Sequence, residues 1–507
     1  MPVTVENVGN LRDRLLWPVL LFACAVPLLL VEFPPLVDLF GHLGRYAIQT
    51  QLAERPELQP YFSYQWQLVG NLGADLLVEL LAPILGLEPT VRLIVLATQL
   101  LAALGMLAIS TALHGRITPF AVCALPLVYA FPFQYGFLNF SLSMALAMLA
   151  FAAWLHLRQS QVAWRAPLFL AIAGLTVWLC HAFGWAFLGL LCGSASLYAR
   201  WTEGRRGADL VLRVLGDCGV LLLAIVPMLV WRTASAGAET NEWSILLKIV
   251  WLTSVFRAGP PLLDWLSAGF LAAVVVAGLL LRPIRANGAM AIAALLCLVA
   301  FLSLPARVFG SFYADMRLVP YMLMVALLAL SAPKLSRAAQ RIVLVAAVVF
   351  LGVRIGATSV DFVEKDRLVQ ANLPALDVIP RGARVVNFAV EQCGFQWRLN
   401  PLRHLGGFAI ARRSAFTNDQ WEVAGANALT VHYPQGEPFV RDPSQSVVPV
   451  ECPDSGLPVL ADSLSSLPRE AFTHIWIHGI EPDAVALPFP ASEIWRGESG
   501  IVFEITR

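Results

Sequence analysis

The chain has 507 residues, of which 58% are hydrophobic and only 14% are charged, and its formal net charge is +1. A soluble domain is usually about 45–50% apolar and about 25% charged, so this chain has too little polar surface to be soluble as a whole. The sequence has no basic stripe with interleaved aromatic residues, which argues against a nucleic-acid partner. Composition therefore predicts an integral membrane protein built mainly from α-helices.

The apolar residues occur in long blocks, and a transmembrane helix needs about 20 of them to cross a hydrocarbon core of about 30 Å. The block from Leu168 to Tyr198 is too long for one span, so it is divided at His181. The resulting prediction is a polytopic helical bundle with the following eleven spans: Leu15–Val31, Val91–Leu113, Ile117–Phe133, Leu138–His156, Leu168–Cys180, Phe183–Tyr198, Val211–Trp231, Leu263–Leu281, Ala289–Leu304, Leu318–Leu330 and Ile342–Ile355.

The segment Asn71–Leu85 is amphipathic rather than uniformly apolar. Asn71, Asp75 and Glu79 lie four residues apart and would form one polar stripe on a helix. The segment is therefore predicted to lie at the membrane surface rather than to cross the bilayer. Together with Val37–Gln51, it gives the first outer loop, residues 32–90, two interfacial helices.

The positive-inside rule sets the predicted orientation. With the N-terminus in the cytoplasm and eleven spans, the basic connections fall inside the cell: His114–Arg116, Arg158–Arg165, Arg200–Arg206 with Arg213, Arg282–Arg285 and Lys334–Arg341. Counting Asn71–Leu85 as a further span would place these connections outside. The sequence therefore predicts a protein of the bacterial inner membrane whose C-terminal part is extracytoplasmic.

The composition changes after Gly356 to a segment rich in proline, charge and polar residues. This predicts a membrane module over residues 1–358 and a small soluble α/β domain over residues 359–507. A helix is expected over Val360–Asn372, with Ser359 capping its start. Strands are expected at Ala383–Val390, His474–His478 and Ile501–Thr506.

Two of the eight cysteines, Cys393 and Cys452, lie outside the predicted spans. An oxidising compartment on that side of the membrane would permit a disulfide between them. The other six lie in or beside spans without the spacing of metal ligands, so they are interpreted as small packing residues.

The first outer loop contains a candidate site. If Val37–Gln51 is helical, Asp38, His42, Arg45 and Gln49 fall at i, i+4, i+7 and i+11 and share one face. An acid, an imidazole and a guanidinium at the membrane surface could hold a divalent cation (Mg²⁺ or Mn²⁺, with Asp38 as ligand) and a phosphate, or activate a hydroxyl. The alternative is an interfacial helix with an ordinary solvated polar face.

Two further groups of charged residues lie near the predicted outer surface. Asp75 is costly on an apolar helix unless it faces water or a cavity, although snorkelling at the interface would also satisfy it. Asp315 and Arg317 lie at the start of a span, in the loop Arg307–Arg317. Arginine there suits a lipid-linked phosphate, and a structural pair between Asp315 and Arg317 is the competing interpretation.

His181 lies at a predicted outer turn between two spans, where a histidine is either a structural hydrogen-bonding group or part of a site. The run Phe131–Phe140 is interpreted first as an aromatic belt at the membrane interface. Its two amides, Gln134 and Asn139, could still line a cavity.

The layout of the chain resembles the GT-C superfamily, the membrane glycosyltransferases that use polyprenyl-phosphate-linked sugars. The resemblance rests on one initial span, a long outer loop with an acid just beyond it, two interfacial helices, a many-helix module and a terminal outer domain. The segment D-L-F-G-H-L-G-R is similar to a D-x-x-x-H-x-x-R loop of bacterial membrane proteins with this layout, as are N-L-G-A-D-L-L, G-F-L-N-F-S-L and Y-A-D-M-R-L-V-P.

The resemblance implies that Asp38 is the first-loop catalytic acid and that Arg317 binds the lipid phosphate. Many members carry a second acid in the next outer loop, and the loop around Phe133–Phe137 has none. This leaves either Asp75 as its substitute or an inactive protein.

The predicted function is inverting transfer of a hexose or pentose from a polyprenyl-phosphate-linked donor to a glycan, lipid or protein acceptor of the cell envelope, on the outer face of the membrane. The residues predicted to carry it are Asp38, His42 and Asp75 for catalysis, and Arg317, Arg45, Asp315 and His181 for the lipid phosphate. Two alternatives stay open at this point: a transporter or flippase, and a non-catalytic scaffold for envelope assembly.

Overall fold

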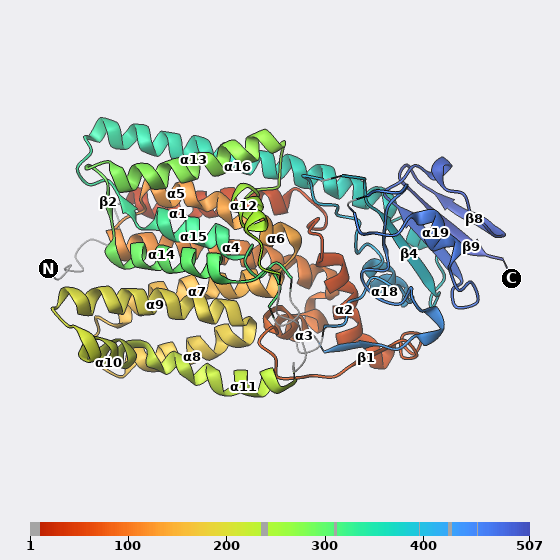
Figure 1. Cartoon of the computed structure of the whole chain (residues 1–507), viewed down its shortest axis with the longest axis horizontal. Coiled ribbons are helices and arrows are strands. Elements are labelled where there is room, and N and C mark those ends of the chain that lie inside the picture. Colours follow the sequence, from red (N-terminus) through yellow and green to blue (C-terminus); the bar gives the residue numbers. More distant parts are fainter. Residues whose placement is uncertain are drawn as a thin grey trace.

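The computed structural model describes residues 11–234, 242–308, 312–394, 396–423, 428–453 and 455–506. Apolar helices occupy one end of the long axis of the molecule, and a mixed β-sheet with short helices occupies the other (Figure 1). Between them lie helices α2 (Leu39–Gln51) and α3 (Gly73–Leu85) of the first predicted outer loop.

Each predicted span coincides with a helix or a series of helices: α1 (Leu11–Leu29), α4 (Leu87–His114), α5 (Pro119–Ala124) with α6 (Phe131–Tyr135), α7 (Leu138–Leu157), α8 (Arg165–Cys180), α9 (Ala182–Thr202), α10 (Gly207–Cys218) with α11 (Ile225–Ala234), α13 (Pro261–Leu280), α14 (Gly288–Ser303), α15 (Leu318–Leu328) and α16 (Arg337–Asn372). Within the described ranges, 6 helices are long and apolar enough to cross a membrane. The total of eleven spans stays a prediction.

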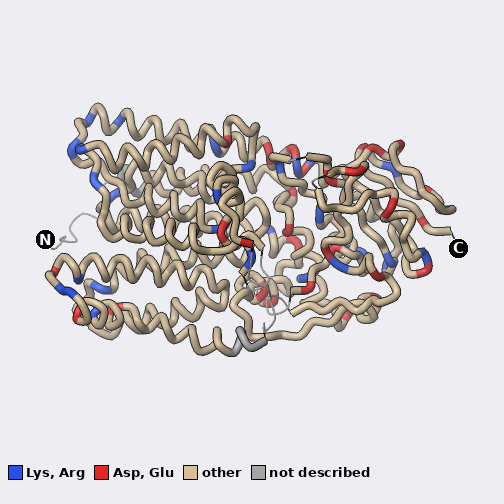
Figure 2. Tube along the Cα trace, viewed as in Figure 1, with Lys and Arg blue, Asp and Glu red and all other residues tan. Residues whose placement is uncertain are grey.

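Charged residues are sparse along the middle of the apolar helices and are more frequent at their ends and in the C-terminal part (Figure 2). The predicted division at His181 is confirmed, because α8 ends at Cys180 and α9 begins at Ala182. The short helix α12 (Ile245–Thr253) was not predicted.

The predicted start of a helix after Ser359 is wrong. Helix α16 runs without interruption from Arg337 to Asn372, so Ser359 lies in its interior. The cap is Ser336, whose side chain accepts a hydrogen bond from the Ala339 backbone N–H. One continuous helix therefore joins the last predicted span to the C-terminal part.

The C-terminal sheet has the strand order β6-β4-β7-β9-β8. Its strands are β4 (Val385–Val390), β6 (Ser446–Val447), β7 (His474–His478), β8 (Ala491–Arg496) and β9 (Gly500–Ile505). β4 is parallel to β6 and β7, and β9 is antiparallel to β7 and β8. All residues of β4 and β7 are buried, as expected for central strands covered on both faces. The three predicted strands are confirmed within one or two residues.

Short helices pack around this sheet: α17 (Ala375–Val378), α18 (Gly407–Arg413) and α19 (Leu460–Ser465). Cys393 and Cys452 form the predicted disulfide. The other six cysteines are free.

The C-terminal part is packed directly on the first outer loop. Helices α2 and α18 lie against each other, and a Cβ on Gly44 would lie only 3.0 Å from the Cα of Gly407. The loop also contributes β1 (Phe62–Tyr64), which pairs antiparallel with β5 (Leu429–Val431). Close approach of the two backbones at glycines therefore fixes α2 between the apolar helices and the C-terminal part.

Candidate active site

Asp38 lies immediately before α2, which begins at Leu39 rather than at the predicted Val37. Its backbone N–H donates to the Tyr135 carbonyl at 2.9 Å, so the first predicted outer loop lies against the second. The Asp38 side chain makes no capping hydrogen bond to the helix. The carboxylate instead lies near the C-terminal part, with Oδ1 3.7 Å from the His404 Nε2.

Gly136 permits this contact between the two loops. Its φ of +103° lies in the left-handed region, and a Cβ on it would lie 2.9 Å from the Asp38 nitrogen and 3.0 Å from the Asp38 Cβ. A side chain at position 136 would therefore displace Asp38 itself.

Gly136→Ala is expected to lower any catalytic rate that depends on Asp38 by about 100-fold, because a misplacement of about 1 Å can have that effect. The initial rate of the purified variant checks this. Gly189→Ala is the matched control, because a Cβ on Gly189 meets nothing within 4 Å. Equal rates for the two variants would show that the position of Asp38 is unimportant.

Four charged or titratable groups from distant parts of the chain surround the Asp38 carboxylate. The His404 Nε2 lies 3.7 Å from Asp38 Oδ1 and 3.9 Å from Asp442 Oδ1. The guanidinium groups of Arg403 and Arg317 act electrostatically on the same carboxyl group. Helix α2, the start of α15 and two C-terminal loops thus converge on one acid.

The charges around Asp38 oppose one another. Burial, and after it the Asp442 carboxylate, raises the pKa of Asp38 to about 8, whereas Arg403 and Arg317 lower it. A carboxyl group with such a pKa can exchange a proton near neutral pH. The arrangement is therefore suited to a general base whose protonation is adjusted by its neighbours.

Arg317 lies just before α15 and is nearly buried, with 6% of its surface exposed. Its guanidinium lies 3.9 Å from the centre of the Phe137 ring, and one of its N–H groups donates to the Phe312 carbonyl at 3.1 Å. Arg403 donates to the Tyr135 hydroxyl at 3.1 Å. The Arg403 side chain is 30% exposed and also pairs with Glu391 at 3.2 Å. The two guanidinium groups provide positive charge of the kind that binds phosphate.

His42 lies one turn after Asp38 in α2, as predicted. Burial, followed by the charges of Arg45 and His404, lowers the pKa of His42 well below its usual range, so the ring is neutral at physiological pH. The Trp421 ring contacts both histidines edge-on, with centroid distances of 5.0 Å to His42 and 5.0 Å to His404. His42 thus forms part of the wall beside Asp38.

Arg45 and Asp75 were predicted to belong to the site around Asp38. They bind each other instead. They form a buried ion pair, and Asn139 donates to the other Asp75 oxygen at 2.9 Å. Gln49, on the same face of α2, donates to the Asp75 backbone carbonyl at 3.0 Å. The Arg45–Asp75 pair therefore joins α2 to α3, and Asn139 joins both to the start of α7. Both carboxylate oxygens of Asp75 have a partner in this arrangement.

Asp75→Asn is expected to lower the free energy of unfolding by about 3–5 kcal/mol, because it leaves a buried guanidinium without its partner. Denaturant titration of the purified protein measures this. Asp209→Asn, which breaks the exposed Arg205–Asp209 pair, is the control and should cost about 0–1 kcal/mol. Similar losses for both variants would contradict a structural role for Asp75.

Asp315 is also paired differently from both predicted alternatives. It forms a buried ion pair with Lys248, with 2.6 Å between Nζ and Oδ2, rather than with Arg317. Lys248 neutralises the Asp315 carboxylate, so Asp315 is not a candidate phosphate contact.

His181 caps α9, since its Nδ1 accepts the Phe183 backbone N–H at 3.1 Å. Its ring also packs edge-on against Phe140 at 5.7 Å. These contacts favour the structural interpretation. The aromatic run is not an interface belt, because Phe131, Phe133 and Phe140 are all buried.

Sequence analysis missed Arg403, His404 and Asp442. None lies in a periodic or motif-like pattern, and the predicted soluble segment contains many other charged residues. A weak signal was available in Gly406-Gly407, which follows His404 and marks the close packing of α18 on α2.

The donor set around Asp38 does not match a divalent-metal centre. Among the residues with described positions, no group of three or more His, Cys, Asp or Glu side chains is placed to hold a metal ion. The positive charge beside Asp38 comes from arginines instead, so the predicted Mg²⁺ or Mn²⁺ stays a prediction.

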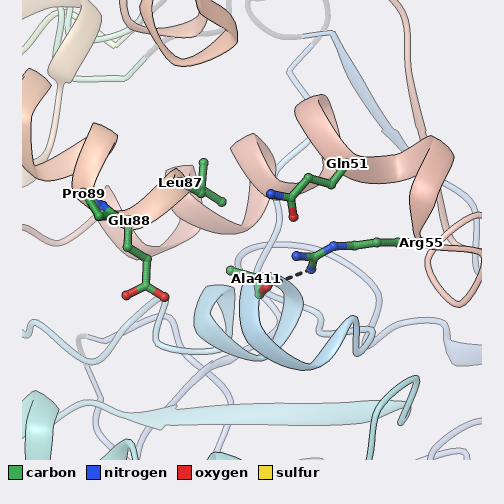
Figure 3. A pocket seen from close by; sticks show the side chains of 6 residues that line it. All are labelled: Gln51, Arg55, Leu87, Glu88, Pro89 and Ala411. Carbon is green, nitrogen blue, oxygen red and sulfur yellow. Dashed lines mark hydrogen bonds between the residues drawn. The ribbon is translucent and has the colours of Figure 1, made fainter. Parts of the chain in front are cut away.

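A pocket of about 300 Å³ lies at the other end of α2, between that helix, α4 and α18 (Figure 3). Its lining residues are Gln51, Arg55, Leu87, Glu88, Pro89 and Ala411. Arg55 points to the C-terminal end of α18 and donates to the Ala411 carbonyl at 2.8 Å. The thirteen residues of α2 separate this pocket from Asp38 by about 20 Å. It is therefore distinct from the candidate active site.

No family model matches the sequence, and no curated protein matches it. The chain is similar in structure to ArnT from Cupriavidus metallidurans bound to undecaprenyl phosphate, with 14% sequence identity, a TM-score of 0.50 and coverage of 98% of this chain and 98% of that chain. The chain has the GT-C fold. Arabinofuranosyltransferase AftD from Mycobacteria also matches, at 15% identity and a TM-score of 0.46, with coverage of 97% of this chain and 40% of that chain.

The GT-C resemblance predicted from the sequence is thus confirmed at the level of fold. The fold and the 6 long apolar helices within the described ranges together identify an integral membrane protein. The role of Asp38 as the first-loop acid stays a prediction.

Proposed function

We propose that this chain is a membrane glycosyltransferase that transfers a sugar from a polyprenyl-phosphate-linked donor to a cell-envelope acceptor. The observation that carries the proposal is the Asp38 carboxyl group, which precedes α2 and is acted on electrostatically by Arg317 and Arg403. Helix α2 lies between the apolar helices and the C-terminal part (Figure 1). The acid suits activation of an acceptor hydroxyl, and the guanidinium groups suit a lipid-linked phosphate. The ArnT structure with the same fold contains undecaprenyl phosphate, which supports this class of donor.

In the proposed mechanism, the acceptor hydroxyl transfers its proton to the Asp38 carboxylate while its oxygen attacks the anomeric carbon of the donor sugar. The bond between that carbon and the phosphate oxygen breaks, and the lipid phosphate leaves with the bonding electron pair. Arg317 and Arg403 neutralise the charge that develops on the leaving phosphate. A single displacement of this kind inverts the configuration at the anomeric carbon.

The other predicted site residues receive supporting roles. His42 keeps the space beside Asp38 neutral and filled, while Arg45 and Asp75 hold α2 in place through their buried pair. The transfer is proposed to occur on the outer face of the bacterial inner membrane, with the N-terminus in the cytoplasm. The disulfide between Cys393 and Cys452 supports an oxidising environment for the C-terminal part.

The second-order rate constant kcat/KM is expected to rise with pH up to about pH 8. Below the pKa of Asp38 the carboxyl group is protonated and cannot accept a proton from the acceptor. Because Asp442 raises this pKa, Asp442→Asn should move the rising part of the pH profile to lower pH. If the rising part of the pH profile lies at the same pH in wild type and in Asp442→Asn, the assignment of Asp38 as the base is contradicted.

The proposal is tested with purified protein in liposomes that contain polyprenyl-phosphate-linked sugars, each labelled in its sugar, with bacterial envelope extract as the source of acceptor. A glycosyltransferase moves the label from at least one donor to an acceptor and releases polyprenyl phosphate. Movement of intact donor across the bilayer without cleavage would instead indicate a flippase. Failure to transfer sugar from any donor of the panel would count against the proposal.

A further inference from the structure

We infer that His404 passes the proton taken up by Asp38 on to Asp442, so that the C-terminal part completes the catalytic centre instead of only covering it. This inference rests on the proposed sugar transfer. It depends on three side chains in a row: the Asp38 carboxyl group, the His404 imidazole and the Asp442 carboxylate. The Nε2 of His404 lies 3.7 Å from an Asp38 oxygen and 3.9 Å from an Asp442 oxygen.

The hydrogen-bond partner of His404 fixes the orientation of its ring. Nδ1 lies 3.0 Å from the Asp419 backbone carbonyl, which can only accept a hydrogen bond. In the neutral imidazole the proton must therefore lie on Nδ1, and the lone pair on Nε2 faces the two carboxyl groups. This is the tautomer that can accept a proton from Asp38.

The surroundings of His404 hold the ring in this place. His404 is 3% exposed, and the Trp421 ring packs edge-on against it at 5.0 Å. The loop that supplies the Asp419 carbonyl is itself buried, and the Asp419 carboxylate accepts a hydrogen bond from the Thr417 hydroxyl at 2.7 Å. The ring therefore keeps its place, and the carboxyl groups, which lie 3.7 and 3.9 Å from Nε2, have to move closer for a proton to pass.

The three groups differ in their access to solvent, and the last of them, Asp442, is the most exposed. The side chains of Asp38, His404 and Asp442 are 17%, 4% and 30% exposed, respectively. Asp442 is held by the Gln445 side-chain amide, which donates to its Oδ1 at 2.7 Å. A proton that reaches Asp442, the most exposed of the three side chains, can therefore pass to water.

The other charges near the relay act on it in both directions. Arg403 and Arg317 act on Asp38 and favour its ionised form, and Arg403 also disfavours a lasting charge on His404. Asp442 does the opposite and favours the protonated ring. His42, the other imidazole close by, stays neutral. His404 is thus protonated only in passing, with the carboxylate of Asp442 as the acceptor.

The proton balance of the relay is complete. The acceptor O–H bond breaks and its proton joins an Asp38 oxygen, while the new bond forms between the acceptor oxygen and the anomeric carbon. The Asp38 proton then moves to His404 Nε2, and from there to an Asp442 oxygen and to solvent. Asp38 returns to the carboxylate for the next cycle, and no oxidant or reductant is involved.

The test uses the full-length protein in lipid nanodiscs with nitrogen-15-labelled histidine, and the signals of His404 are assigned by their absence in His404→Ala. If the Nε2 of His404 interacts with both carboxyl groups, the pH at which the His404 nitrogen-15 signals titrate should shift in Asp38→Asn and in Asp442→Asn. Titration of His404 that is unchanged in both variants would overturn the relay, and this readout does not depend on any sugar donor.

The second part of the test measures transfer of labelled sugar from the polyprenyl-phosphate donor panel. His404→Ala should lower the rate on the order of 10- to 100-fold, less than the loss of the base itself, and added imidazole should restore part of the rate. His432→Ala, which removes an exposed histidine, is the control. It should leave the transfer rate at the wild-type value, with or without added imidazole. A wild-type rate in His404→Ala, or a slow variant with a normal unfolding temperature that imidazole does not rescue, would overturn the relay. No transfer by the wild type with any donor would overturn the proposed function and the relay with it.

Discussion

Asp38→Asn is expected to lower the rate of sugar transfer by about 10²–10⁴-fold, the usual contribution of a positioned general base. Asparagine keeps the size and shape of the side chain but cannot accept a proton. The backbone contact to Tyr135 and the packing of α2 should survive, because neither uses the carboxylate. The initial rate of label transfer in proteoliposomes, at saturating donor, measures the effect.

The control for this variant is Glu79→Gln, which neutralises an exposed carboxylate on α3 and should leave the rate within about twofold of wild type. The unfolding temperatures of both variants show whether the fold is retained. A folded Asp38→Asn protein with the wild-type rate would exclude Asp38 as the base. Asp442, which acts electrostatically on Asp38, would then be the next acid to test.

Arg317→Gln is expected to lower kcat by about 10²–10³-fold. This is the usual effect in enzymes of removing one preorganised group that stabilises the charge developing in the transition state. The guanidinium of Arg317 is held between the Phe137 ring and the Phe312 carbonyl, so its charge is directed without free rotation. Arg317→Lys should recover only part of the rate, because lysine lacks the planar pair of donors. Single-turnover measurements separate this effect from release of product.

Arg381→Gln removes an exposed arginine that is paired with Glu57, and serves as the matched control for charge. Its rate should equal that of wild type. If Arg317→Gln raises only KM and leaves kcat unchanged, Arg317 binds the donor equally in ground state and transition state, and the assignment to the leaving phosphate would be wrong.

Hydropathy was sufficient to predict the helices of the membrane part, because burial in lipid demands a long apolar segment that is visible in the local sequence. The polar stripe of Asn71, Asp75 and Glu79 distinguished α3 from the predicted spans, because a segment with such a stripe is not uniformly apolar. The short runs that form β4 and β7, all of whose residues are buried, also left a local signal, because they are rich in β-branched and aromatic residues. Ser359 does not mark a helix start, since a good capping residue can equally lie within a continuous helix.

The pairing of charged residues could not be predicted from local patterns. Asp315 binds Lys248, which is 67 residues away in the sequence, although Arg317 is its neighbour. The spacing of Arg45 within α2 was read as a shared face with Asp38, yet Arg45 turns to Asp75 on another helix. Desolvation makes an unpaired buried charge costly, so the partner is chosen by the tertiary packing and not by sequence distance.

The candidate site was therefore predicted only in part. Asp38 and Arg317 lie together at the centre of the site because they end or begin helices of the membrane part, and such positions are readable from hydropathy. His404 and Asp442 reach Asp38 only because α18 packs on α2 through glycines and β5 pairs with β1. Contacts of this kind arise from the assembled fold.

The most direct measurement is the amount of polyprenyl phosphate released per molecule of glycosylated product, when purified protein in liposomes is given a labelled polyprenyl-phosphate-linked sugar and an envelope extract. A glycosyltransferase that uses Asp38 as its base should release one lipid phosphate for each sugar transferred, and both products should disappear together in Asp38→Asn. Donor that is bound but returned intact by the wild-type protein would contradict sugar transfer at this site.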